Sequence, residues 1–335
     1  MLAILEKPPI NRGDPAGFAT PPPQDELSRG PTLLSLQSLT PECRLQPTGA
    51  PSRSRTVIRP SAGWRAINFA ELYQYRELLW ILAARDIKVR YKQTALGVLW
   101  AILQPVLTMV VFTVVFGRLA GLDKQIGGGI PYPVYALCAL LPWQLFANSL
   151  AQAGNSLVGN QNLLRKIYFP RLVMPISSVL SGLVDFAIGF LVLAGMLVVY
   201  AATGHAVVPS WALLALPAFV ALAFLTALAA GLWLSALNVQ YRDVRYVIPF
   251  LVQFWMFATP IAYPSSLIRN KSELLYTLYG LNPMVGVVDG FRWALLGKAD
   301  PPGLMLLVSV ATVALLLAGG LFYFRRMEKS FADVV

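Results

Sequence analysis

The chain has 335 residues, of which 56% are hydrophobic and only 13% are charged, and its mean hydropathy is +0.60. Soluble domains carry roughly 25% charged residues, so the composition argues against a soluble enzyme and indicates a membrane protein. The net charge of +11 does not indicate nucleic-acid binding, because the cations lie in short loops beside apolar segments. Two cysteines and one histidine argue against a disulfide framework, a metal site and His-based catalysis.

The first 60 residues differ in composition from the rest. They contain eleven prolines among serine, arginine, glycine and threonine, and such a segment cannot bury enough apolar surface to offset its chain entropy. We therefore predict a disordered tail over 1–60 and a membrane domain over 61–335. An alternative is a non-Met start codon near Val57, since no methionine lies between Met1 and Met109. The N-terminal apolar run is too short for a signal peptide, so the first span is expected to direct insertion.

Residues 68–89 are predicted to form an amphipathic helix. Asn68 and Glu71 have the spacing of a capping box. Apolar and polar residues occupy different faces: Leu72, Tyr75, Leu79 and Leu82 against Gln74, Arg76 and Glu77. The helix is too polar to span a bilayer, so we expect it in the headgroup plane with Trp80 as an anchor. Packing against another subunit is the alternative.

Six apolar stretches follow, each close to the roughly 20 residues that a span needs. They cover 95–117, 133–152, 172–200, 211–236, 246–262 and 303–324. The two flanks and alternate loops hold most of the cations, which predicts that both termini are cytoplasmic. The sequence therefore predicts an all-α membrane protein with six transmembrane helices.

Four cations stand directly before the first span. These residues, called the basic collar below, are Arg85, Lys88, Arg90 and Lys92. Cations at such a position attract anionic headgroups and resist transfer across the bilayer. The collar therefore indicates that the first crossing begins in the cytoplasm.

The fifth stretch ends in Pro260 and Pro264, and the segment from 265 to about 297 is moderately apolar but broken at Asn282-Pro283. It is too long for a hairpin and too apolar for a free loop. Irregular backbone at membrane depth must be buried in protein or line a cavity. We therefore predict short re-entrant helices on the outer side, in a loop that carries Arg269, Lys271, Arg292 and Lys298.

Polar residues inside the spans are few. Asp185 is the one acidic residue deep in a predicted span, and no cation is expected at its depth, which favours a structural hydrogen bond or a wet cavity over ion coupling. Gln104-Pro105 and Asn148 either face a conduit or serve helix packing.

No motif for catalysis or nucleotide binding is visible in the sequence. The segment from Gly290 to Lys298 lacks the glycine spacing and the Ser or Thr of a phosphate loop, and no HExxH motif or nucleophile elbow occurs. We therefore expect a chain without its own catalytic or ATPase site, cofactor or metal. Energy, if used, must come from a partner.

The predicted cytoplasmic loop between spans two and three is the best candidate for docking such a partner. It could form a short amphipathic helix that ends near Phe169, before a proline. Its candidate contact residues combine apolar side chains with a basic rim: Asn160, Leu163, Leu164, Arg165, Lys166, Phe169 and Arg171. A plain cation-bearing loop is the alternative, against which the apolar content argues.

Several segments together resemble one family. They are RDIKVRYKQTALGVLWAILQPVLTMVVFTVVFGRLA from Arg85, NQNLLRKIYFPRLVMP from Asn160, LNVQYRDVRYVIPFLVQFWMFATPIAYP from Leu237 and LNPM from Leu281. In this order they are similar to the type-2 ABC permeases that export O-antigen, capsular polysaccharide and teichoic acid. The resemblance covers roughly residues 57–335 and leaves the proline-rich tail outside.

The resemblance implies a homodimer of permeases with two separate cytosolic ATPase subunits, which would hold ATP and magnesium. It also implies an interfacial gate helix at about 68–90, a coupling helix between spans two and three, and re-entrant helices at the periplasmic exit. The implied substrate is a glycan on undecaprenyl pyrophosphate. The basic collar would receive the pyrophosphate, since arginine clamps phosphate with two hydrogen bonds; simple topology is the alternative role.

Family members move the glycan through an aromatic-lined channel between the protomers. The candidate rings here come from spans one, two and five: Trp100, Phe112, Phe116, Tyr135, Trp143, Phe146, Trp255 and Phe257. An aromatic belt or lipid-facing packing is the alternative for each ring.

The resemblance thus implies a polysaccharide exporter in the cytoplasmic (inner) membrane, surrounded by membrane lipids. The alternatives are an exporter of drugs or small lipids from the same superfamily, a membrane enzyme of envelope glycan synthesis, and a passive channel. The missing catalytic motifs argue against the enzyme, and the apolar docking loop argues against the channel.

Overall fold

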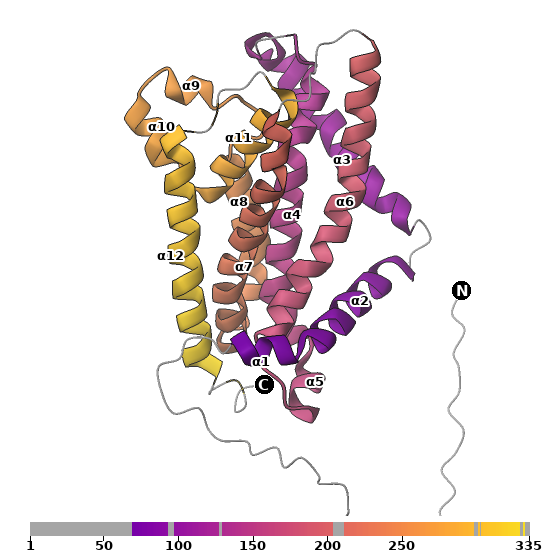
Figure 1. Cartoon of the computed structure of the whole chain (residues 1–335), viewed down its shortest axis with the longest axis vertical. Helices are drawn as coiled ribbons and strands as arrows, with labels where there is room; N and C mark the ends of the chain where they lie inside the picture. Colours follow the sequence, from indigo (N-terminus) through magenta and orange to yellow (C-terminus); the bar gives the residue numbers. More distant parts are fainter. Residues whose placement is uncertain are drawn as a thin grey trace, which may run out of the picture. The chain divides into compact units, whose positions relative to one another are not determined.

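The computed structural model describes residues 69–92, 97–126, 129–203, 211–297, 301, 303–328 and 331. The predicted tail over 1–60 and the predicted capping residue Asn68 lie outside these residues. All regular secondary structure in the described part of the chain is helical (Figure 1). The predicted all-α fold class is therefore confirmed.

Helices of very different length make up the fold. The long ones are α3 (Val98–Phe112), which continues as the π-helical segment η1 (Thr113–Leu119), α4 (Tyr132–Gly159), α6 (Val173–Ala202), α7 (Leu216–Gln240) and α12 (Gly303–Glu328). Three shorter helices lie in the lower part of Figure 1: α1 (Phe69–Gln74), α2 (Arg76–Lys92) and α5 (Gln161–Lys166). The remaining elements are η2 (Leu122–Gln125), η3 (Trp211–Ala215), α8 (Val244–Phe257), α9 (Ser266–Arg269), α10 (Glu273–Tyr279) and α11 (Pro283–Leu296).

Five helical segments are long and apolar enough to cross a membrane. They correspond to the predicted spans one to four and six, and they cover Leu99–Leu119, Tyr132–Gly159, Val173–Ala202, Trp211–Gln240 and Gly303–Glu328. The predicted fifth span, 246–262, overlaps α8, which has 14 residues and ends at Phe257. Such a helix covers about 21 Å, less than the roughly 30 Å of a hydrocarbon core. Pro260 accounts for this end, because a proline disfavours helical backbone in the residue before it.

The central helix of the bundle is α4. It has the lowest mean hydropathy of the five segments, 1.3, yet 78% of its most apolar window is buried, against 39% or less in the other four. Its main neighbours are α6 and α7. A Cβ at Gly231 of α7 would lie 2.7 Å from the side chain of Ala153, so the two backbones approach closely only because residue 231 is glycine. Most of α4 is therefore surrounded by other helices rather than exposed.

One end of the bundle collects the segments that the sequence predicts to be cytoplasmic, and we call it the inner end (Figure 1, bottom). A cluster of buried apolar side chains joins them: Leu82, Leu157, Phe169, Leu172, Val173, Met174, Leu232, Ala236, Val239, Phe324 and Phe331. Arg171 reinforces the junction by donating to the backbone carbonyl of Glu328 at the end of α12.

The two sides of α1 and α2 have different surroundings. The side with Leu72, Tyr75, Leu79 and Leu82 packs against the inner-end cluster, while Gln74, Arg76 and Glu77 are exposed. Exposed apolar side chains also occur on α2, among them Trp80, Ile81 and Val89. The segment predicted as one helix over 68–89 thus contains two helices that break at Tyr75. The second, α2, carries apolar surface in addition to the side that the bundle covers.

The opposite end, called the outer end, contains α9, α10 and α11 between α8 and α12 (Figure 1). Arg292 of α11, predicted as a loop cation, is only 2% exposed. It donates to the carbonyls of Pro260 (2.6 Å) and Ile261 (2.7 Å) in the irregular segment after α8. Its guanidinium lies 3.7 Å from the ring centroid of Tyr135 and 3.9 Å from the Asp289 carboxylate. Arg292 therefore holds α11, the end of α8 and α4 together.

We expect Arg292→Met to destabilise the protein strongly, because it leaves two carbonyls without a donor and Asp289 without a cation. Breaking one partner of a buried ionic contact costs roughly 3–5 kcal/mol. Thermal unfolding of the purified protein in detergent, followed by tryptophan fluorescence, measures the loss. Lys271→Met, the same change at an exposed cation of the outer end, is the control. Equal unfolding midpoints for the two variants would contradict this role of Arg292.

Candidate functional site

The basic collar separates into two parts in the folded chain. At about 100° per residue, Arg85, Lys88 and Lys92 follow one side of α2, whereas Arg90 lies about 140° around the axis from Arg85. Lys88 and Lys92 are exposed. The Arg85 side chain, 41% exposed, pairs with Asp86 at 2.8 Å and donates to Oδ1 of Asn160 at 2.8 Å. Arg85 thus reaches the C-cap of α4, whereas Arg90 is directed at α6.

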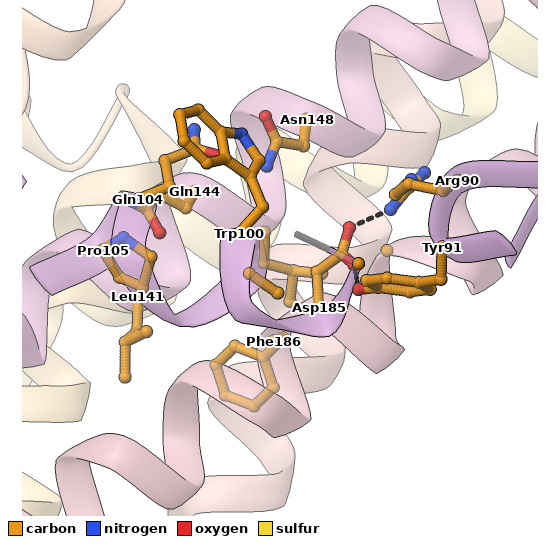
Figure 2. Close-up of a pocket in the computed structure, with 14 residues that line it drawn as sticks. Arg90, Tyr91, Trp100, Gln104, Pro105, Leu141, Gln144, Asn148, Asp185 and Phe186 are labelled. Atoms are coloured by element: carbon orange, nitrogen blue, oxygen red, sulfur yellow. Dashed lines mark hydrogen bonds and ion pairs between the residues drawn. The ribbon is translucent and has the colours of Figure 1, made fainter. Parts of the chain in front are cut away.

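Arg90 forms an ion pair with Asp185 of α6 (Figure 2). The guanidinium also donates to Gln152 of α4, and the Tyr91 hydroxyl donates to Asp185. The expectation that no cation reaches the depth of Asp185 is therefore wrong. The chain order places Arg90 before the first span, but α2 packs against α6 and carries its last turn to the carboxylate.

Burial determines the electrostatics of this group. Desolvation lowers the pKa of Arg90, yet a guanidinium stays protonated in proteins, so its charge requires a partner. Desolvation also raises the pKa of Tyr91, which the Arg90 charge opposes. The phenol therefore stays neutral and donates its proton to the carboxylate. Arg90 and Asp185 together carry no net charge.

A cavity of about 170 Å³ lies beside the pair, between α2, α3, α4 and α6 (Figure 2). Its polar wall comes from Trp100 and Gln104 of α3 and from Gln144 and Asn148 of α4. The members of each pair are four residues apart and so lie on one face of their helix. We call this space the amide cavity. Among the described residues, no group of three or more His, Cys, Asp or Glu side chains could hold a metal ion.

Gln144 and Asn148 belong to a polar row along α4 and its C-cap. Polar residues recur there at every fourth position: Gln144, Asn148, Gln152, Ser156 and Asn160. Gln152 binds Arg90 and Asn160 binds Arg85, while Gln144 and Asn148 line the amide cavity. Sequence reasoning singled out Asn148 but missed Gln144 and Gln152, although the four-residue spacing was a readable signal.

The eight aromatic candidates have three kinds of environment. Phe112, Tyr135, Trp143 and Phe146 are buried inside the protein, and Phe116 and Trp255 are partly buried. Phe146 packs edge-on against Trp255, with ring centroids 4.8 Å apart. Trp100 and Phe257 are exposed by 55% and 62%. In this conformation these two rings offer the most surface to a ligand, and Trp100 lies at the amide cavity.

The loop between α4 and α6 contacts the rest of the protein at both of its ends. Asn160 accepts from Arg85 at its start, and Phe169 is buried in the inner-end cluster at its finish. Leu163 and Leu164 of α5 pack partly against the same cluster. The outward surface consists of Arg165 and Lys166 with Ile167 and Tyr168, the last two exposed by 55% and 71%. Tyr168 was not among the predicted contact residues.

We expect the double variant Arg90→Leu/Asp185→Leu to unfold closer to wild type than either single variant. Each single change leaves an uncompensated charge in a partly buried site, whereas the double change removes both charges. A double-mutant cycle from thermal unfolding should give a coupling of about 1 kcal/mol or more. The same cycle on Arg85 and Asp86, whose arginine is more exposed, is the control and should give less. Additive single effects at Arg90 and Asp185 would contradict this coupling.

Comparison with known proteins assigns the family. The model of the ABC-2 type transporter family matches residues 77–296. The chain is 35% identical over 263 residues to the O-antigen export system permease protein RfbA of Myxococcus xanthus, covering 77% of this chain and 96% of that protein. It is 27% identical to an RfbA of Klebsiella pneumoniae (77% and 95% covered) and 26% identical to the polysialic acid transport protein KpsM of Escherichia coli (74% and 92% covered). The chain therefore belongs to the ABC-2 type transporter family.

Proposed function

We propose that the chain is the permease subunit of an ABC transporter that exports a polysaccharide across the cytoplasmic membrane. The observation that carries the proposal is the 35% identity to an O-antigen export permease over 96% of that protein's length. The similarity to a polysialic acid transport protein points to the same class of cargo. Five apolar helices of spanning length support the membrane location.

In this proposal the chain crosses the inner membrane six times, with α8 as a short fifth crossing and both termini in the cytoplasm. The helices α9–α11 are re-entrant on the periplasmic side, and the extensive burial of α11 supports that position. The helix α2 lies in the headgroup plane as a gate, which its exposed Trp80 and Ile81 support. Two copies of the chain form the transport path between them.

A separate cytosolic ATPase subunit supplies the energy and holds ATP and magnesium. The surface made by Arg165, Lys166, Ile167 and Tyr168, called the docking knob, is its contact in this proposal. An exposed aromatic ring beside an aliphatic side chain and two cations has the composition of an interface hot spot. The buried Phe169 and the Arg85–Asn160 hydrogen bond support a rigid connection from this knob to α2.

The glycan in this proposal is attached to undecaprenyl pyrophosphate, and the outward part of the collar receives the pyrophosphate. Lys88 and Lys92 are exposed, which supports this role, whereas Arg90 is engaged by Asp185. The sugars pass the exposed rings of Trp100 and Phe257, which offer stacking surface. The rings buried inside each protomer support the wall of this path from behind.

Deletion of the gene should abolish the surface polysaccharide and leave lipid-linked glycan in the cytoplasmic membrane. Immunoblots of surface glycan and extraction of the lipid-linked pool measure both effects. A plasmid copy of the wild-type gene is the control and should restore display. Normal display of every surface glycan in the deletion strain would refute the proposal, and a change confined to drug susceptibility would favour a drug exporter instead.

Replacing Ile167 and Tyr168 together with alanine should lower export and ATPase co-purification by about tenfold or more, because truncating a hot-spot residue costs roughly 2 kcal/mol or more and a tenfold change in affinity is about 1.4 kcal/mol. The matched control is Leu274→Ala/Leu275→Ala, which removes two exposed apolar side chains of α10 at the outer end. Both double variants should keep the wild-type unfolding midpoint. Full ATPase binding by the Ile167/Tyr168 variant would contradict the docking knob.

A further inference from the structure

The amide cavity adjoins a second pocket of different chemistry. This open pocket, of about 480 Å³, is lined by Arg85, Asp86, Val89, Arg90 and Gln152, and we call it the collar pocket. Arg90 lines both spaces. A ligand with two adjoining parts can therefore place one part in each pocket, with the Arg90 guanidinium between them.

The two pockets differ in charge. The charged side chains of the amide cavity are Arg90 and Asp185, which neutralise each other. An anion in this cavity would meet the Asp185 carboxylate, and a cation would meet a guanidinium. In the collar pocket Arg85 is paired with Asp86, and Arg90 is already engaged by Asp185. The positive excess beside this pocket comes from the exposed Lys88 and Lys92 on the same helix. A neutral group fits the first pocket, and an anionic group fits the second.

The hydrogen-bonding groups of the amide cavity suit hydroxyls. Each amide of Gln104, Gln144 and Asn148 presents both a donor and an acceptor, and a hydroxyl can use both. These three side chains make no hydrogen bond to protein groups within the described residues. Polar side chains that only glue helices together would bond across the helix interface. The amides are instead left available to a ligand.

The remaining walls suit the carbon skeleton of a ring. Trp100 offers an indole face, and Pro105, Leu141, Leu145 and Phe186 add apolar surface. The volume of about 170 Å³ is below the roughly 300–1,000 Å³ of pockets for drug-sized molecules. The cavity therefore has room for one small ring and not for a chain of rings.

We propose that the amide cavity binds one uncharged pyranose ring of the exported glycan, while the anionic group next to that ring occupies the collar pocket. The inference rests on the proposed function for the source of the ring, but its binding chemistry is testable without export. It assigns Gln104, Gln144 and Asn148 as hydrogen-bonding residues and Trp100 as the stacking residue.

Cysteine protection tests the two pockets separately. The full-length chain, with Cys43→Ser and with the fully buried Cys138 retained, is placed in phosphatidylcholine nanodiscs. Three single cysteines report on different surfaces: Ala101→Cys in the amide cavity, Val89→Cys in the collar pocket and Val111→Cys on the exposed side of α3. Their rates of reaction with a methanethiosulfonate are measured with octyl β-glucopyranoside or octyl phosphate as probe.

Octyl glucoside should slow labelling of Ala101→Cys by about fivefold at 80% occupancy, and octyl phosphate should slow labelling of Val89→Cys instead. Neither probe should protect Val111→Cys. Adding Gln104→Leu/Gln144→Leu should abolish protection at residue 101, whereas Gln74→Leu, the same change at an exposed residue of α1, should not. Protection of residue 101 by the phosphate, by both probes equally or by neither probe would overturn the proposal.

The failure of this inference differs from the failure of the proposed function. If the deletion strain loses its surface glycan but labelling shows no sugar protection, the proposed export function is supported and the proposed sugar site is refuted. If the strain keeps its glycan, the proposed export function is refuted, whatever the labelling shows. When both hold, the Gln104→Leu/Gln144→Leu variant should export less glycan than the Gln74→Leu control while keeping its ATPase partner.

Discussion

The ion pair between Arg90 and Asp185 is the interaction on which the inner half of the molecule depends. A guanidinium cannot shed its proton to escape a poorly hydrated site, and a carboxylate on a membrane helix is costly without a partner. Each residue therefore requires the other. The helix α2 must lie against α6 for this reason, and its position closes one wall of the amide cavity. Of the other collar residues, Arg85 bonds to the C-cap of α4, and Lys88 and Lys92 stay exposed.

The pair also explains how a comparatively polar helix occupies the centre of the bundle. The polar row of α4 would be unfavourable against lipid, and the bundle covers it with α2, α3 and α6. Gln152 and Asn160 are satisfied by arginines of α2. Gln144 and Asn148 are one to two turns farther along α4 than Gln152, and neither arginine of α2 bonds to them. The row thus changes along its length from a structural element to a surface that can accept a ligand.

Length and hydropathy were sufficient to predict five helices of spanning length, because those properties are local. The end of α8 near Pro260 is local as well, but the predicted span ran past it. The partner of Asp185 could not be predicted, since Arg90 is 95 residues away in the chain and only packing joins them. Helical geometry could have separated Arg90 from the rest of the collar. Which of the neighbours Tyr168 and Phe169 is buried depends on the inner-end cluster, which no local pattern reveals.

Two arginines join separate helices, one at each end of the bundle, and their burial differs. Arg292 is 2% exposed and binds backbone carbonyls, so releasing it would leave several polar groups unpaired in the interior. The side chains of Arg90 and Asp185 are 28% and 22% exposed, so water can replace part of their contact when they separate. Separating Arg90 from Asp185 therefore costs less free energy than releasing Arg292 from its carbonyls. In the proposed export cycle, this lower cost favours movement of α2 over movement of α11.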